Sequence, residues 1–229
     1  MLGILMLQTR FPRVPGDVGY PGSLSFPVRH RVVPGARPAR VVRGGADDAP
    51  LLEAFVRAGL ELVQEGATAL STSCGFLARW QRELQVALPV PVWTSALLQL
   101  ADDPKRRCGV ITIEVTSLTP AHFEAVGADP STPVEGIEPG SPLHRTLLED
   151  RPELDVVNAR EQVLAAGRRL LRRHPEIDTL VLECTNLPPY AQALRTETER
   201  PVLDVLTMLN ARWAALQAEG PRPSLSEND

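Results

Sequence analysis

Short apolar segments alternate with stretches of helical periodicity along most of the chain. Residues 3–8 (GILMLQ) form a continuous apolar run, which is typical of a strand covered on both faces of its sheet. Similar runs predict strands at 31–33, 40–42, 67–71, 90–93, 109–114, 179–183 and 201–204. Because helices separate most of these strands, the pattern predicts an α/β fold with mostly parallel sheets.

The clearest helix lies between Asp47 and Gly66. Asp47 and Asp48 supply an N-cap and first-turn charge, and Pro50 suits the first turn. Its apolar stripe comprises Leu51, Leu52, Phe55, Val56, Leu60 and Val63. Further helices are predicted to follow a turn at 73–75, to follow the 90–93 strand, to begin at 119–120, and to span 160–173 and 205–217.

The segment from Arg10 to Arg37 is unusually dense in proline and glycine. Long loops inside compact domains are usually functional or disordered, and the aromatic and basic residues in this one favour a function. We expect residues 10–34 to fold over the site as a lid that excludes water.

The two halves of the chain resemble each other. GILMLQTR from Gly3 aligns with GVITIEVT from Gly109, and ALSTSCGFL around Cys74 aligns with LVLECTNLP around Cys184. The separations are nearly equal, at 106 and 110 positions. This duplication predicts two pseudo-twofold-related lobes with a cleft between them. The lobes comprise 1–98 plus 207–219 and 99–206, with 220–229 as a flexible polar tail.

Cys74 and Cys184 stand at equivalent points of the two halves. Each follows the carboxyl end of a predicted strand and precedes a helix, which is where open α/β sheets bind ligands. The positive end of such a helix attracts carboxylates and lowers the pKa of a thiol. We therefore predict that both are acid/base residues of one site, although a free cysteine is more often simply buried. Cys108 precedes a strand at the opposite end and is expected to be inert.

Composition excludes several classes of function. With 24 Lys+Arg against 28 Asp+Glu, the chain lacks the basic footprint of a nucleic-acid-binding protein. Its apolar runs are too short for a transmembrane span, and no signal peptide is evident, so we expect a cytoplasmic protein without a membrane partner. A monomer and a homodimer are both compatible with the sequence. Three cysteines without CxxC spacing argue against a disulfide framework, and scattered histidines argue against a metal site. The histidines are His30, His122, His144 and His174.

The segments LSTSCGF and VLECTNLPPY resemble the two cysteine motifs of the aspartate/glutamate racemase superfamily. The resemblance implies a cofactor-independent racemase in which one thiolate removes a Cα proton from a small carboxylic acid or amino acid. The opposing thiol then donates a proton to the other face. The strand at 109–111 with Thr116 is similar to the family's segment that binds a substrate carboxylate. Substrate-binding residues are thus expected at Ser73, Gly75, Phe76, Thr116, Ser117, Thr185 and Asn186.

Pseudo-symmetry adds Arg10, the counterpart of Thr116, to the candidate substrate-binding residues. Together with Arg13 it would form a carboxylate clamp, or else both arginines are solvated loop residues. Glu183 either orients groups of the site or caps a neighbouring helix. Phe76 and Tyr190 either form walls of the pocket or pack in the core.

The sequence also departs from the family pattern. Gly75-Phe76 stands where many amino-acid racemases have Asn-Thr, and Asn186 stands where they have His or Glu. These differences leave open an enzyme similar to maleate isomerase or arylmalonate decarboxylase, which would use one cysteine. The sequence is also compatible with a non-catalytic protein that binds small acids and, more weakly, with a redox pair.

Overall fold

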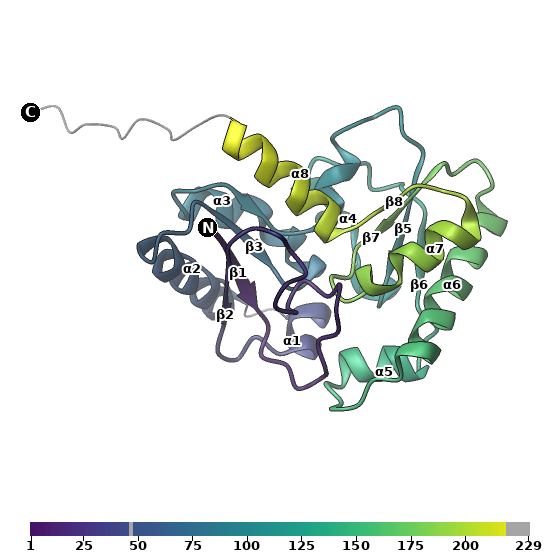
Figure 1. Cartoon of the computed structure of the whole chain (residues 1–229), viewed down its shortest axis with the longest axis horizontal. Helices are drawn as coiled ribbons and strands as arrows, with labels where there is room; N and C mark the ends of the chain where they lie inside the picture. Colours follow the sequence, from purple (N-terminus) through teal and green to yellow (C-terminus); the bar gives the residue numbers. More distant parts are fainter. Residues whose placement is uncertain (46–47, 219–229) are drawn as a thin grey trace, which may run out of the picture.

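The computed structural model describes residues 1–45 and 48–218, so the proposed N-cap Asp47 and the 220–229 tail lie outside the described residues. Two four-stranded parallel sheets organise the chain, and Figure 1 shows them side by side. The sheet orders are β2-β1-β3-β4 and β6-β5-β7-β8. This arrangement confirms the predicted α/β fold with two similar lobes.

The first sheet lies with α2 and α3 at the left of Figure 1. Its strands are β1 (Leu2–Met6), β2 (Val28–Val32), β3 (Ala69–Thr72) and β4 (Val92–Trp93). The accompanying helices are α1 (Pro38–Arg43), α2 (Ala49–Gln64), the 3₁₀ helix η1 (Gly75–Trp80), α3 (Gln81–Ala87) and the 3₁₀ helix η2 (Ala96–Leu100).

The second sheet lies with α6 and α7 at the right of the figure. Its strands are β5 (Cys108–Thr112), β6 (Val134–Gly136), β7 (Thr179–Leu182) and β8 (Val202–Leu203). The helices are η3 (Val115–Ser117), α4 (Pro120–Ala125), α5 (Pro142–Leu148), α6 (Val156–Arg173), η4 (Pro188–Tyr190), α7 (Ala191–Thr198) and α8 (Val205–Ala218).

The helix α8 returns to the first sheet. Its residues Val205, Met208 and Leu209 belong to a buried cluster that also contains residues of β1, β3 and β4. Trp213 of α8 stacks on Phe26, with ring centroids 4.8 Å apart. These contacts attach the end of the chain to the first lobe, while the exact lobe boundaries stay a prediction. Among the helices of the described residues, none combines the length and apolar character needed to cross a bilayer.

Local structure differs from the sequence prediction at four elements. Residues 40–42, predicted as a strand, lie in helix α1, which begins at Pro38 and ends where Gly44 takes a φ of 65°. The strand β6 and the helix α5 were not predicted, because both are short and lack clear periodicity. The helix that follows β4 is of the 3₁₀ type, with the Ser95 hydroxyl accepting from Leu97 N–H.

Candidate active site

Cys74 and Cys184 line the same narrow cavity. Both follow the carboxyl ends of the central strands β3 and β7, and both are free thiols. The polar or small residues around the cavity are Ser73, Cys74, Gly75, Cys184, Thr185 and Asn186, and the apolar ones are Leu7, Phe11, Pro38, Val42, Phe76, Ile113, Leu147 and Leu148. Among these described lining residues, none carries a formal charge.

Two equivalent helices form the apolar walls. Pro38 and Val42 come from α1, which follows β2, and Leu147 and Leu148 come from α5, which follows β6. The two helices pack against each other. The cavity is therefore closed by contact between the lobes, through the very elements that the sequence pattern did not predict.

The residues flanking the cysteines cross from one lobe to the other. The Thr185 hydroxyl, one residue after Cys184, donates to the carbonyl of Ser73, one residue before Cys74, at 2.6 Å. On the opposite side, a Cβ atom on Gly75 would overlap with the backbone oxygen and Oε1 of Glu183. Each residue after a cysteine thus contacts the residue before the other cysteine, which holds the two strand ends together.

Glu183 is a fully buried carboxylic acid beside this crossing. Its Oε2 accepts a hydrogen bond of 2.8 Å from the Thr112 hydroxyl, and its Oε1 has no hydrogen-bond partner among the described residues. Burial raises the pKa of Glu183 to about 8. The side chain is therefore largely neutral at pH 7, and the space for it exists because residue 75 is glycine.

The thiol pKa values run against the sequence prediction. Burial, followed by the nearby Glu183, raises the pKa of Cys74 to about 12 and that of Cys184 well above its usual value. The short 3₁₀ helices η1 and η4 that follow the cysteines do not offset this burial. The predicted lowering of the thiol pKa is therefore wrong for the cavity without substrate.

The two thiols have different partners. The backbone N–H of Phe76 stabilises the Cys74 thiolate, with smaller contributions from the charges of Arg13 and Arg79. The Cys184 thiol donates to Oδ1 of Asn186 at 3.7 Å. Cys184 also receives a backbone hydrogen bond from Asn186, but lies near the negative Asp17.

Solved structures of three enzymes superpose on nearly the whole chain. Unliganded arylmalonate decarboxylase gives a TM-score of 0.62 at 16% identity, covering 97% of this chain and 96% of its own. Allantoin racemase from Klebsiella pneumoniae gives 0.63 at 18% identity, covering 96% and 89%. A glutamate racemase from Bacillus anthracis gives 0.62 at 19% identity, covering 96% and 82%. The chain therefore has the same two-lobed α/β fold as these three enzymes.

Sequence relatives carry a different activity in their names. Dimethylsulfoniopropionate lyase 7 of Emiliania huxleyi is 28% identical over 239 residues, which span 96% of this chain and 68% of that protein. A dimethylsulfoniopropionate lyase of Durusdinium sp. clade D is 26% identical over 226 residues, spanning 90% and 71%. No protein-family model matches the chain. The chain is thus similar in fold to racemases and a decarboxylase, and similar in sequence to proteins named as lyases.

Three of the predicted substrate-binding residues do not line the cavity that contains Cys74 and Cys184. The side chain of Arg10 is 68% exposed and pairs with Asp150, with Nε 3.3 Å from Oδ2. Thr116 is exposed and bonds to Glu114, and Ser117 lies beside it in η3. The counterpart relation between Arg10 and Thr116 places both where the chain has already left the strand, beyond the cavity wall.

Thr185 and Asn186 do not cap the helix that follows Cys184. The N-cap position of η4 is Leu187, and Pro188 is the first residue of the helix. The Thr185 hydroxyl bonds to Ser73 instead, and the Asn186 side chain donates to Oδ2 of Asp17 at 2.7 Å. Asp17 is a site residue that sequence reasoning missed, because nothing in its proline-rich surroundings places it near a cysteine.

Two aromatic residues and a histidine complete the surroundings of the two cysteines. Phe76 lines the cavity, and buried His122 packs edge-on against it with centroids 5.7 Å apart. Burial lowers the pKa of His122 to about 4, so it stays neutral. Tyr190 is buried outside the cavity lining, which fits a role in core packing.

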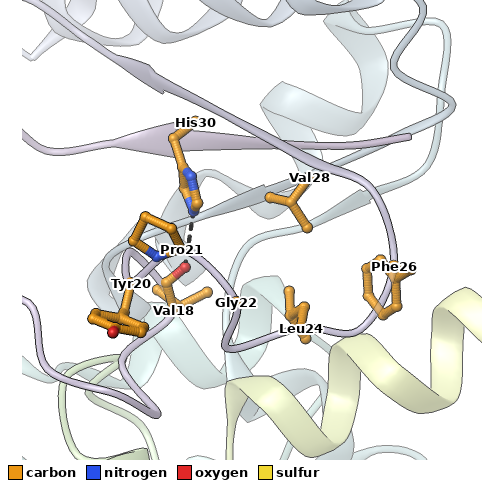
Figure 2. Close-up of a pocket in the computed structure, with 8 residues that line it drawn as sticks. All are labelled: Val18, Tyr20, Pro21, Gly22, Leu24, Phe26, Val28 and His30. Carbon is orange, nitrogen blue, oxygen red and sulfur yellow. Dashed lines mark hydrogen bonds between the residues drawn. The ribbon is translucent and has the colours of Figure 1, made fainter.

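A second cavity lies away from the cysteines. Figure 2 shows it between the loop residues 18–26 and the strand β2, where His30 Nε2 is 3.1 Å from the carbonyl of Val18. Its other lining residues are Tyr20, Pro21, Gly22, Leu24, Phe26 and Val28. Its titratable residues are Tyr20 and His30, and the His30 ring is already bonded to the Val18 carbonyl. The cavity with two thiols at equivalent strand ends is the candidate active site.

Proposed function

We propose that this protein is a lyase that removes a proton from the α carbon of a small carboxylic acid and expels a leaving group from the β carbon. Dimethylsulfoniopropionate is the substrate to test first. The observation that carries the proposal is a cavity with two thiols and no charged side chain among its described lining residues. The lyase names of the relatives support the same choice.

The uncharged lining bears on the class of substrate. An amino acid brings an ammonium group, and aspartate or glutamate brings a second carboxylate. Each buried charge without a partner costs several kcal/mol by a rough estimate. A sulfonium acid brings a diffuse cation instead, which the aromatic ring of Phe76 in the lining suits, whereas the Phe11 ring already has the Arg13 guanidinium over it. Its single carboxylate would bind backbone N–H groups that follow Cys74 and Cys184.

A cationic substrate would also lower the high pKa values of the thiols. An opposite charge within a few ångströms favours the thiolate, so binding of the sulfonium lowers the pKa of the nearby thiol. The thiolate then takes the α proton, and the electron pair of the C–H bond forms the double bond between the α and β carbons. The bond from the β carbon to sulfur breaks with both electrons moving to sulfur. The products are neutral dimethyl sulfide, acrylate and a protonated thiol.

Racemisation is the second candidate function. The observation that favours it is the contribution of one thiol by each lobe at equivalent strand ends. Both functions begin with removal of the α proton, and they differ in the fate of the carbanion. In the racemase the second thiol returns a proton to the opposite face, whereas in the lyase the carbanion loses its leaving group.

One assay separates the two functions. Purified protein is incubated with dimethylsulfoniopropionate, and dimethyl sulfide is measured in the headspace. In parallel, exchange of α hydrogen with solvent deuterium is followed for both enantiomers of aspartate and glutamate. We expect sulfide release that Cys74→Ser abolishes and Cys184→Ser only reduces, with Cys108→Ser as the unaffected control. Exchange of the amino acids without sulfide release, lost in both active-site variants, would establish the racemase instead.

A further inference from the structure

The N-terminal loop reaches the second cysteine through a chain of three side chains. Arg13 donates to Asp17 at 3.0 and 3.3 Å, and the Asn186 amide nitrogen donates to Oδ2 of Asp17 at 2.7 Å. The other end of the same amide, Oδ1 of Asn186, accepts from the Cys184 thiol at 3.7 Å. No corresponding side-chain acceptor contacts Cys74 among the described residues, while each sulfur receives a backbone hydrogen bond, from Phe76 at Cys74 and from Asn186 at Cys184.

The carboxylate of Asp17 fixes the orientation of the amide. An ionised carboxylate only accepts hydrogen bonds, so the NH₂ group of Asn186 must face it and the amide oxygen must face the sulfur. An oxygen facing the sulfur accepts from a thiol but repels a thiolate. If the amide turned over, its NH₂ group would face Cys184 and would favour the thiolate.

Asp17 is itself held rigidly. It is 2% exposed, and besides Arg13 it accepts from the backbone N–H of Gly19 at 2.7 Å. Its neighbour Val18 is buried in the cluster beneath α8 and forms part of the cavity in Figure 2. On its other side, Gly16 lies against the backbone of Pro189. The loop therefore spans from the core of the first lobe to the second lobe, with Asp17 at the contact.

We infer that Asp17 is a positioning residue that acts through Asn186 to hold Cys184 as a neutral thiol, which leaves Cys74 as the base that removes the α proton. The inference deepens the proposed function, on which the role of Cys74 rests. In the lyase, Cys184 is then a thiol that contacts the substrate without taking its proton. In the racemase, it is the first proton donor.

The other charged and titratable groups around Cys184 do not make the same distinction. Glu183 raises the pKa of both thiols, and each of Cys74 and Tyr190 interacts with Cys184 as one more ionisable group of the cluster. Asp17 raises the pKa of Cys184, whereas Arg13 and Arg79 lower that of Cys74. These charges act through space, and the double variant Asp17→Ala/Asn186→Ala separates the direct effect of the Asp17 charge from the orientation of the Asn186 amide.

The test compares alkylation of the two cysteines in the same protein by iodoacetamide, followed by mass spectrometry at one pH. When the pH lies well below the pKa of a thiol, lowering that pKa by about 1 raises the thiolate fraction about tenfold. Because both thiols line one cavity, the Cys184 to Cys74 rate ratio corrects for changes in access. We expect Asp17→Ala and Asn186→Ala each to raise this ratio about tenfold. In Asp17→Asn the single amide oxygen is taken by Arg13 and the Gly19 N–H, so an NH₂ group faces Asn186 and the ratio should rise as in Asp17→Ala.

The double variant decides between orientation and simple charge. If Asp17 acts through Asn186, adding Asp17→Ala to Asn186→Ala changes the ratio no further. A further rise would mean that the charge of Asp17 acts directly on Cys184 and would overturn the inference, as would an unchanged ratio in Asn186→Ala. Should Asp17→Ala fail to fold, Asp17→Asn and Asn186→Ala still give the answer. No substrate enters this measurement, so failure of the lyase assay and failure of this inference are distinguishable.

Discussion

The two lobes pair their strands in the same register but present different side chains to the site. Leu2 pairs with Ala69 in the first lobe, as Cys108 pairs with Thr179 in the second, and the edge strands β4 and β8 repeat the correspondence. At the strand ends the equivalence stops: Ser73 and Gly75 flank one cysteine, and Glu183 and Thr185 flank the other. The duplicated backbone brings two thiols together, and the differing neighbours give them different environments.

The contrast is sharpest between Ser73 and Glu183. The Ser73 hydroxyl accepts from Leu7 N–H at 2.8 Å, whereas Glu183 occupies the equivalent place with a buried, partly unsatisfied carboxylic acid. A serine titrates nowhere near neutral pH, but the pKa of Glu183 lies at about 8. Ionisation of Glu183 in the second lobe therefore makes both the site and the stability of the protein depend on pH.

Glu183→Gln is expected to give the largest effect. Folded Glu183 keeps its proton up to about pH 8, while the unfolded carboxyl releases it near its ordinary pKa of 4.5. The folded state thus binds more protons in this window, and the free energy of unfolding falls as pH rises, by up to about 1.4 kcal/mol per pH unit. The glutamine variant lacks this slope. Urea unfolding of both proteins across the window measures the difference.

The control is Glu53→Gln, which replaces an exposed carboxylate on α2. This variant should keep the same change of unfolding free energy with pH as the wild type. Parallel stability curves for the wild type and Glu183→Gln would mean that Glu183 is ionised and solvated in the folded protein. The contrast between the two flanking residues would then disappear.

Gly75→Ala tests the contact between the lobes at Gly75 and Glu183. The new Cβ would overlap with the backbone oxygen and Oε1 of Glu183, and such overpacking costs about 1–3 kcal/mol of unfolding free energy. In Gly45→Ala the exposed Cβ would meet only Oδ1 of Asp48, at 3.8 Å, so that this control should change stability by less than about 0.5 kcal/mol. Equal stability of the two variants in urea would show that the lobes can separate at Gly75 without cost.

Much of the fold was predictable because its signals are local. The apolar runs of β1, β3, β5 and β7 and the stripe of α2 predict those elements from a few neighbouring residues. The duplication could be read from two short alignments, and it correctly brought Cys74 and Cys184 to one cavity. The residues next to the cysteines in sequence could be placed at the cavity for the same reason, since the ends of the strands fix their position.

The remaining parts of the site depend on contacts between distant segments. The helices α1 and α5 are six and seven residues long, so neither builds a periodic pattern, and only a proline at the first turn marks each start. Asp17 reaches Asn186 across 169 positions of sequence, and Asp150 captures Arg10 across 140. No property of the single residues distinguishes these pairings from those of solvated loop residues.

Thr185→Val tests the second contact between the lobes, the hydrogen bond from Thr185 to Ser73. Valine keeps the shape of threonine but removes the 2.6 Å hydrogen bond to the Ser73 carbonyl, which leaves a buried acceptor without this partner. We expect a loss of about 1 kcal/mol in the free energy of unfolding, smaller than for Gly75→Ala because a bond is lost and no overlap is created. Thr196→Val, at an exposed position of α7, is the matched control. A loss no larger than in the control would contradict a structural role for this crossing.

Arg10→Ala should give the smallest effect, and it tests whether the pseudo-symmetry extends beyond the strands to a carboxylate clamp. The ion pair with Asp150 is exposed on the arginine side, and such pairs contribute about 0–1 kcal/mol. Alanine also keeps the stronger anchor, since the backbone N–H of residue 10 donates to Oδ1 of Asp150 at 2.5 Å whatever the side chain. We therefore expect nearly unchanged stability and a KM for the sulfonium acid within about twofold of the wild type. Steady-state kinetics measures the KM, with Arg151→Ala, at another exposed arginine, as the control. A rise of tenfold or more, about 1.4 kcal/mol, with kcat preserved would mean that the Arg10 side chain leaves Asp150 to bind the substrate carboxylate, and the symmetry-based prediction would hold after all.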